Sequence, residues 1–136
     1  MHLVYLKEET NLYKILIIED DEQLRSMYQR LFSLHGYESY ALTAGEDVMQ
    51  TVLKKKPNVI LLDIMLPSYT GMSILLSLKK NKLTKDCVVI MLTNVASQEE
   101  KEKSYANGAA LYLIKNDYDP MQLYSLVHKT VKKLYN

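Results

Sequence analysis

Short apolar segments alternate with longer amphipathic segments along most of this chain. The short segments are rich in β-branched, aromatic and leucine residues, and this composition predicts β-strands. They cover residues 14–18, 37–41, 59–62, 87–92 and 110–114. The first, third and fourth are apolar at consecutive positions, which is typical of strands that helices cover on both faces.

The segments between these strands carry apolar residues at helical spacing. Residues three and four positions apart share one face of a helix, so this spacing predicts a buried stripe. The longest stripes are Leu24, Met27, Tyr28 and Leu31, and Tyr124, Val127, His128 and Val131. Shorter stripes run through residues 48–53 and 74–78.

Capping residues indicate where the helices begin and end. Thr43–Glu46 and Ser97–Glu100 both have the S/T-x-x-E pattern, whose side chains bond to free amides at a helix start. Asp119–Pro120 places a favourable N-cap before a proline at the first helical position. Gly36 and Gly108 follow two of the helices, where a left-handed closing residue is preferred.

Five alternations of strand and helix with short connections predict an α/β fold with helices on both faces of a parallel sheet. We expect a flavodoxin-like, doubly wound (βα)5 arrangement with strand order 2-1-3-4-5. The chain has 136 residues, which is the size of one domain. Residues 14–136 are expected to form that domain, and residues 1–13 a loose N-terminal extension.

Composition narrows the class of protein. A hydrophobic content of 48% is that of a folded globule, and a net charge of +1 gives no electrostatic reason for a nucleic-acid or membrane partner. Cys87 is the single cysteine, and no paired Cys/His spacing predicts a zinc site. Charged residues near the N-terminus, where a signal peptide is apolar, favour a cytoplasmic protein.

Acidic residues gather where the first strand ends, at Glu19–Glu22. A capped helix start accounts for one or two of these four. It does not account for Asp63, the one charge in the apolar run 59–66, because a carboxylate beside a buried strand is costly unless it is paired or metal-bound. Ligands of such folds bind where the strand order reverses, at the carboxyl ends of the first and third strands. Glu19, Asp20 and Asp63 should therefore meet there.

These three carboxylates predict a site for a hard metal ion. Adjacent strands lie about 4.8 Å apart, and crowded like charges either raise a pKa or recruit a cation. Oxygen ligands with no histidine or cysteine nearby favour Mg²⁺, with Mn²⁺ as the alternative.

Two further groups end the remaining strands. Thr93 ends the fourth strand and Lys115 the fifth. Taken singly, Thr93 is explained equally well as a helix cap and Lys115 as a surface lysine. Taken together with the carboxylates, they suit phosphoryl transfer, with Asp63 as the nucleophile and the metal and Lys115 offsetting charge.

Four motifs occur in order: Ile17–Glu22, Leu61–Gly71, Met91–Thr93 and Gly108–Lys115. Their combination resembles the receiver domain of bacterial two-component response regulators, over about residues 14–135. The resemblance implies a phosphorelay domain, not an enzyme, in which Asp63 accepts a phosphoryl group from a sensor histidine kinase or a histidine phosphotransfer protein.

The resemblance also implies roles for individual residues. Glu19, Asp20 and Asp63 would hold the magnesium ion, with the backbone carbonyl of Met65 as a further ligand. Thr93 and Lys115 would stabilise the phosphoryl group.

A switch is implied as well. Thr93 and Tyr112 would couple the site to the surface formed by the fourth helix, fifth strand and fifth helix. That surface would contact a downstream protein or a covalently linked output domain, with homodimerisation as an alternative, and no nucleic acid would bind this chain alone. The fourth helix, residues 97–107, has a weak apolar stripe. A weakly anchored helix that moves during switching and a charged helix that is merely solvated explain this equally well.

Three positions depart from the family pattern. Glu19 stands where aspartate is more usual, Asn94 where a small residue is common, and Asn116 where proline with a cis bond is usual. A cis bond without proline costs about 3–4 kcal/mol. We therefore predict either a trans Lys115–Asn116 bond with a reshaped loop or a strained cis bond, and both affect how Lys115 is placed.

The departures keep an alternative function open, that of a degenerate receiver acting as a phosphorylation-independent interaction module. A third candidate, a Mg²⁺-dependent phosphohydrolase, usually has a second carboxylate two residues after its nucleophile. Here that position is Met65.

Overall fold

The computed structural model describes residues 13–43, 47–67 and 69–135. Apart from Tyr13, the N-terminal extension expected at residues 1–13 lies outside these ranges. Within them, no helix is both long enough and apolar enough to cross a lipid bilayer.

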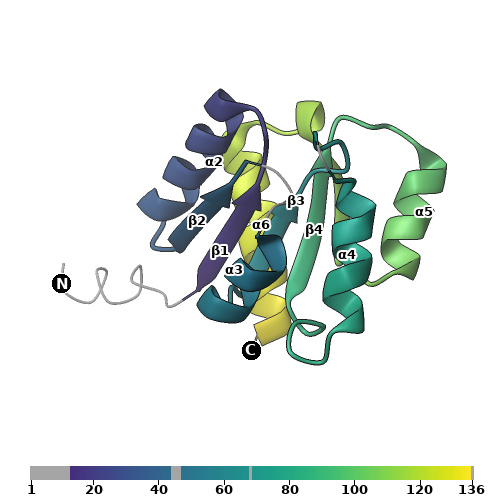
Figure 1. Ribbon diagram of the computed structural model, residues 1–136. Coiled ribbons are helices and arrows are strands. Elements are labelled where there is room, and N and C mark those ends of the chain that lie inside the picture. Colours follow the sequence, from purple (N-terminus) through teal and green to yellow (C-terminus); the bar gives the residue numbers. More distant parts are fainter. Residues whose placement is uncertain (1–12, 44–46, 68, 136) are drawn as a thin grey trace.

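Five strands form one parallel sheet in the order β2-β1-β3-β4-β5, as predicted (Figure 1). The strands are β1 Lys14–Ile18, β2 Glu38–Leu42, β3 Val59–Leu62, β4 Val88–Thr93 and β5 Leu111–Ile114. Three strands begin one residue later than predicted, at β2, β4 and β5. For β2 the reason is local, because the amide of Tyr37 donates to the carbonyl of Phe32 and so closes the preceding helix.

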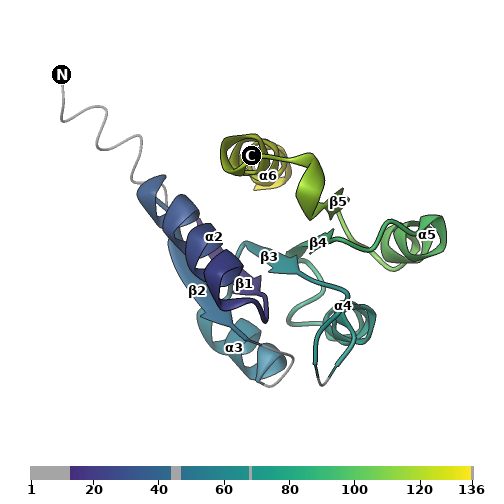
Figure 2. The ribbon, with the colours of Figure 1, turned by 90° about the horizontal axis from the view of Figure 1, so that it is seen from above.

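The five predicted helices are α2 to α6, and a short 3-10 helix, η1, follows β5. Their bounds are α2 Glu22–Leu34, α3 Val48–Lys55, α4 Gly71–Lys80, α5 Gln98–Ala106, η1 Lys115–Asp117 and α6 Pro120–Tyr135. Viewed from above, α2 and α6 lie on one face of the sheet and α3, α4 and α5 on the other (Figure 2). The predicted doubly wound, three-layer arrangement is confirmed.

Alternating strand residues supply the two halves of the core. Ile15, Ile17 and Leu61 pack with the apolar sides of α2 and α6, whereas Leu16, Ile18 and their neighbours pack with α3 and α4. All four residues of β3 and all six of β4 are buried. Burial on both faces explains why these strands read as unbroken apolar runs in the sequence.

Most of the predicted caps are present. Ser97 caps α5 by accepting from the amide of Glu100, and Asp119 caps α6 by accepting from the amide of Gln122. Gly36 and Gly108 have positive φ angles of 90° and 99°. The side chain of Gln122 returns the bond to the amide of Asp119, so α6 begins with a reciprocal capping pair.

The capping box predicted at Thr43–Glu46 includes residues 44–46, which lie outside the described ranges. Helix α3 begins at Val48, and its N-cap is Asp47, with a left-handed φ of 61° and no side-chain capping bond. Val48 is also the first buried residue of this helix.

Candidate functional site

Three carboxylates meet at the carboxyl ends of β1 and β3. Glu19 directly follows β1 and Asp63 directly follows β3, and the last residues of these neighbouring strands, Ile18 and Leu62, are paired in register. Glu19, Asp20 and Asp63 each offer an oxygen, and these oxygens lie within 4.8 Å of one another. Glu19 and Asp63 are buried, whereas Asp20 is exposed. The predicted cluster is confirmed.

The other two acidic residues of the sequence cluster have a structural role. Asp21 is the N-cap of α2, where its side chain accepts from the amide of Leu24 at 3.0 Å, and Glu22 lies in the first helical turn. A capped helix start therefore accounts for Asp21 and Glu22, and leaves Glu19 and Asp20 for the site.

Lys115 reaches this cluster from the carboxyl end of β5, two strands along the sheet from β3. Its Nζ lies 2.5 Å from Glu19 Oε1 and 2.6 Å from Asp63 Oδ2, and its side chain is 9% exposed. The alternative of a solvated surface lysine is therefore wrong. The Lys115–Asn116 bond is trans, and Lys115 opens the 3-10 helix η1, so of the two predicted loop geometries the trans one is correct.

Burial and pairing act on the charges of the site in opposite directions. Burial raises the pKa of Glu19, and the hydrogen bond from Lys115 only partly offsets this. Burial also disfavours the charged form of Lys115, but hydrogen bonds to Asp63 and Glu19 outweigh it, and the pKa of Lys115 is raised. The lysine is therefore held as an ammonium ion between the two buried carboxylates.

Hydrogen bonds within the loop after β3 fix the orientation of the Asp63 carboxylate. Asp63 Oδ1 accepts from the amide of Met65 at 3.1 Å, and Met65 pairs with Thr70 in an isolated antiparallel bridge. The amide of Gly71 donates to the carbonyl of Ile64 at 2.8 Å. A Cβ at Gly71 would lie 2.0 Å from the carbonyl oxygen of Asp63, so only glycine fits here.

Thr93 and Tyr112 are both buried and both contact Val95. Thr93 Oγ1 accepts from the amide of Val95 at 3.3 Å, and the hydroxyl of Tyr112 donates to the carbonyl of Val95 at 2.5 Å. The amide of Tyr112 donates in turn to the hydroxyl of Tyr105 on α5. The alternative of Thr93 as a helix cap is wrong, since Ser97 caps α5.

Two residues at the site were not singled out from the sequence. The guanidinium of Arg25 donates to the carbonyls of Glu19 and Asp20, at 3.0 and 3.4 Å. Tyr28, predicted as a core residue, lines a narrow space together with Glu19 and Asp63, and burial raises the pKa of its hydroxyl. In the sequence, Tyr28 stands out as a phenol in the otherwise aliphatic stripe of α2, and this could have indicated that it lies beside the site.

Two of the departures from the family pattern contact each other. The side-chain oxygen of Asn94, directly after β4, accepts from the backbone amide of Asn116 at 3.2 Å. The loops after β4 and β5 are joined by this bond beside Lys115.

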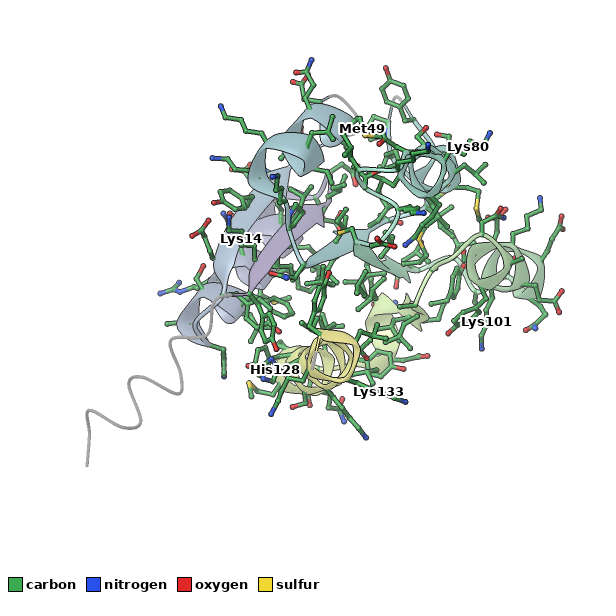
Figure 3. The ribbon with its side chains drawn as sticks, turned by 90° about the horizontal axis from the view of Figure 1, so that it is seen from below. Lys14, Met49, Lys80, Lys101, His128 and Lys133 are labelled. Carbon is green, nitrogen blue, oxygen red and sulfur yellow. The ribbon has the colours of Figure 1, made fainter. Side chains whose placement is uncertain are left out.

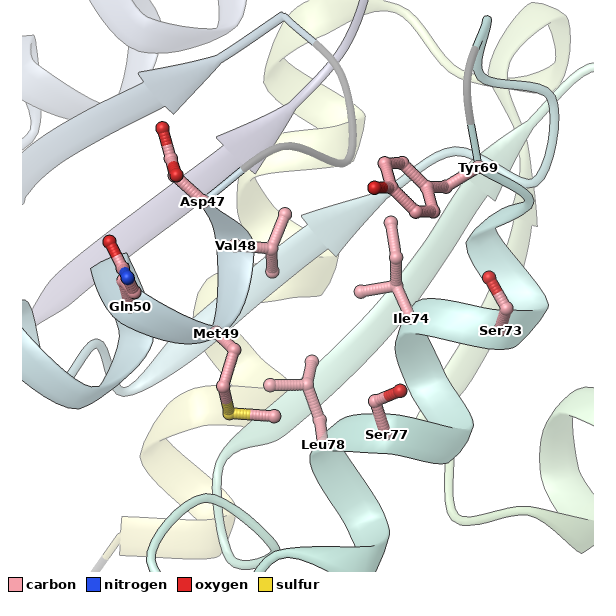
Figure 4. A pocket seen from close by; sticks show the side chains of 9 residues that line it. All are labelled: Asp47, Val48, Met49, Gln50, Tyr69, Ser73, Ile74, Ser77 and Leu78. Carbon is pink, nitrogen blue, oxygen red and sulfur yellow. The ribbon is translucent and has the colours of Figure 1, made fainter.

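A separate hollow lies between α3 and α4, and none of the predicted site residues lines it (Figure 4). Its volume is about 300 Å³. Its walls are Asp47, Val48, Met49, Gln50, Tyr69, Ser73, Ile74, Ser77 and Leu78. The carboxylates and the ammonium ion are at the end of the sheet, so we place the candidate chemistry there.

Comparison with known proteins gives a consistent result. The family model described as the response regulator receiver domain matches residues 15–128. Among curated proteins, the chain is 29% identical over 119 residues to the phosphate regulon transcriptional regulatory protein PhoB of Pseudomonas aeruginosa, covering 88% of this chain and 52% of that protein. The chain thus spans about half the length of the curated relatives it matches.

Solved structures agree with this comparison. A CheY-like response regulator receiver domain protein from Methanospirillum hungatei is 26% identical with a TM-score of 0.84, covering 91% of this chain and 97% of that one. A DNA-binding response regulator of the LuxR family from Staphylococcus aureus is 29% identical with a TM-score of 0.79, covering 88% of this chain and 99% of that one.

Proposed function

The chain belongs to the response regulator receiver domain family of two-component systems, and on that premise we propose that it accepts a phosphoryl group on Asp63 from a histidine kinase or a histidine phosphotransfer protein. One observation carries the proposal: Asp63 lies at the end of β3 with an ammonium ion 2.6 Å from one oxygen and two further carboxylates beside it. This is the charge arrangement that phosphoryl transfer to a carboxylate requires.

The donor set suits Mg²⁺. Glu19, Asp20 and Asp63 supply oxygen ligands, and the exposed Asp20 gives a cation access from solvent. Three carboxylates beside one ammonium ion leave a formal charge of −2, which a divalent cation balances. We assign the backbone carbonyl of Met65 as a further ligand, and Mn²⁺ as an alternative ion. A bound ion would neutralise charge that develops on the transferring phosphoryl group.

Each residue then has a defined chemical role. An oxygen of the Asp63 carboxylate forms a bond to phosphorus while the bond from phosphorus to the donor imidazole breaks, and that imidazole keeps the electron pair. Lys115 offsets charge on the phosphoryl oxygens, and the Thr93 hydroxyl donates a hydrogen bond to one of them. The product is an acyl phosphate on a signalling domain, with no turnover of an outside substrate.

The switch follows from the contacts around Val95. A phosphoryl group adds about −1.5 to −2 charge at neutral pH, which attracts the Thr93 hydroxyl. Because Thr93 and Tyr112 contact the same residue, movement of Thr93 is transmitted to the surface formed by α5, β5 and α6. We propose that this surface binds a downstream protein or a linked output domain, or a second copy of the chain, in the cytoplasm.

Intact-mass measurement tests the phosphoacceptor role. The protein is incubated with acetyl phosphate and Mg²⁺, and the parent is expected to gain the mass of one phosphate. Asp63→Asn should gain none, and chelation of Mg²⁺ should prevent the gain in the parent. Asp117→Asn is the matched control, because Asp117 is an exposed carboxylate at the same end of the sheet, and it should be modified like the parent.

Either of two results would contradict the proposal: an unmodified parent, or a parent and an Asp63→Asn variant modified alike. An unmodified parent that still bound its partner would favour the phosphorylation-independent interaction module.

A further inference from the structure

The turn that carries Lys115 is capped from a neighbouring loop. Lys115 is the first residue of η1, and the residue before it, Ile114, has an apolar side chain that makes no capping bond. The amide of Asn116 is one of the first amides of this turn, which have no partner within the turn itself. Asn94 accepts from that amide at 3.2 Å and so does what an N-cap side chain does, from the loop after β4.

The position of Asn94 makes this contact direct. Thr93 and Ile114 are partners in the β4–β5 ladder, so Asn94 comes one residue after this pair and Asn116 two residues after it. A proline at position 116 has no amide hydrogen, so an acceptor at position 94 would have nothing to accept. The hydrogen bond therefore depends on both departures together, because Asn94 supplies the acceptor and Asn116 supplies an amide that proline would lack.

The contact bears on the placement of the lysine. A lysine side chain has four rotatable bonds, so the position of the Lys115 amine depends on how firmly its backbone is held as well as on its ion pairs with Glu19 and Asp63. On one side of Lys115 the backbone is held by β5. On the other side, the bonds that hold it are the one from Asn116 to Asn94 and a weaker 3.5 Å bond from the amide of Tyr118 to the carbonyl of Lys115.

We infer that Asn94 is a positioning residue for Lys115, which it fixes against Asp63 through the backbone amide of Asn116. The inference rests on the proposed function only for its effect on the rate of phosphorylation. The fixing of the lysine itself is a property of the unmodified protein.

The kinetic test is a double-mutant cycle of Asn94→Ala and Lys115→Ala, measured as the rate at which Asp63 gains phosphate from acetyl phosphate with Mg²⁺. Asn94→Ala should slow the parent by about five- to tenfold, the range expected from loss of one hydrogen bond that orients a reacting group. In the Lys115→Ala background the same change should have no further effect, because the group being positioned is gone. Asn94→Asp keeps an acceptor oxygen and should stay within about twofold of the parent.

Nuclear magnetic resonance of the unmodified protein gives a second measurement. In the parent, the amide of Asn116 should exchange slowly with solvent, and the two hydrogens on Cε of Lys115 should give separate signals, since the side chain is held in one position. Asn94→Ala should speed the exchange and merge the two signals, while the signals of the β-sheet stay unchanged.

The outcomes separate the two proposals. If the parent gains no phosphate but the Lys115 signals merge in Asn94→Ala, the phosphoacceptor function is wrong and the positioning role stands. If Asn94→Ala slows phosphorylation equally in both backgrounds, or leaves the Lys115 signals separate, Asn94 does not act through Lys115.

Discussion

At the scale of single residues, the three carboxylates differ in what surrounds them. Glu19 and Asp63 are buried and share the ammonium ion of Lys115, whereas Asp20 is exposed and its backbone carbonyl accepts from the guanidinium of Arg25. The buried pair needs its lysine, because an unpaired buried charge is costly. Because the side chain of Asp20 is exposed, it can bind a cation that enters the site from solvent.

Gly71 is a second residue whose identity the site dictates. Gly71→Ala would place a Cβ 2.0 Å from the carbonyl oxygen of Asp63, and this contact can be relieved only by moving the backbone. We expect the free energy of unfolding to fall by about 2–3 kcal/mol, typical of overpacking that forces the backbone to move. Urea denaturation measures this change.

Ser77→Ala is the control, since Ser77 is exposed on the same helix, and it should change the stability by less than about 0.5 kcal/mol. A Gly71→Ala protein as stable as the parent would show that the helix can shift at no cost.

At the scale of elements, α5 is the helix that packing holds least. Of its nine residues, all described, Ser104 alone is buried, whereas α2 and α6 each bury three apolar or aromatic residues. Its N-terminal cap and the bond from Tyr112 to Tyr105 are therefore a large part of what fixes it. The weak stripe seen in the sequence corresponds to a weakly anchored helix next to the proposed switch.

Ser97→Ala tests this view of α5. Loss of an N-cap costs about 1 kcal/mol. Because α5 adds little to the core, this loss should lower mainly the free energy of local opening of α5 and not that of global unfolding. Amide hydrogen exchange within residues 98–106 should become roughly fivefold faster, while exchange in β3 stays unchanged. Lys101→Ala, an exposed change in the same helix, should leave exchange as in the parent. Equal acceleration in β3 and α5 would instead show that α5 unfolds only with the whole domain.

At the scale of the whole molecule, the carboxylates of the site and three groups of lysines lie at opposite ends of the sheet. Glu19, Asp20 and Asp63 lie at the carboxyl ends of β1 and β3, and lysines occupy the last turns of α3, α4 and α6. Lys80 and Lys133 are labelled near the ends of α4 and α6 in the view from below (Figure 3). These lysines complement the negative ends of the helix dipoles.

An aromatic cluster joins α2 to α6 on one face of the sheet. His128 stacks on Tyr124 with ring centroids 5.3 Å apart, and its Nδ1 lies 2.7 Å from the hydroxyl of Tyr37. The ring of His35, at the end of α2, lies 4.1 Å from that of Tyr124 on the other helix. Burial lowers the pKa of His128, and the nearby Lys132 and His35 lower it further.

The lowered pKa of His128 makes stability depend on pH. As the pH falls below the ordinary histidine value of 6.5, the unfolded chain takes up a proton on His128 before the folded protein does. The free energy of unfolding should therefore be constant above pH 6.5 and should fall as the pH drops from 6.5 through the pKa of the folded protein. Urea denaturation from about pH 5 to 8 measures this dependence.

His128→Phe removes the titrating group while keeping a ring, and should flatten the curve. Glu19, whose pKa is raised, contributes the opposite slope in both proteins, so the difference between their curves isolates His128. Identical slopes in parent and variant would exclude this role.

The alternation of apolar runs and helical stripes was enough to predict the parallel sheet and its layers, and the flavodoxin-like strand order then predicted that Glu19, Asp20 and Asp63 meet. Periodicity determines which face of an element is buried, and the βα connections then leave few arrangements of the strands. Local capping patterns identified two further helix starts, since Ser97 caps α5 and Asp119 caps α6.

Contacts between distant segments were decided by the tertiary structure. Lys115 between Glu19 and Asp63, Asn94 on the amide of Asn116, and the backbone of Gly71 against Asp63 join residues that have no fixed spacing in the chain. A sequence determines which chemical groups are present and which face of a helix or strand they occupy. Where a flexible side chain ends, and which amide needs an acceptor, depend on the distance between loops, and only the packed sheet sets that distance.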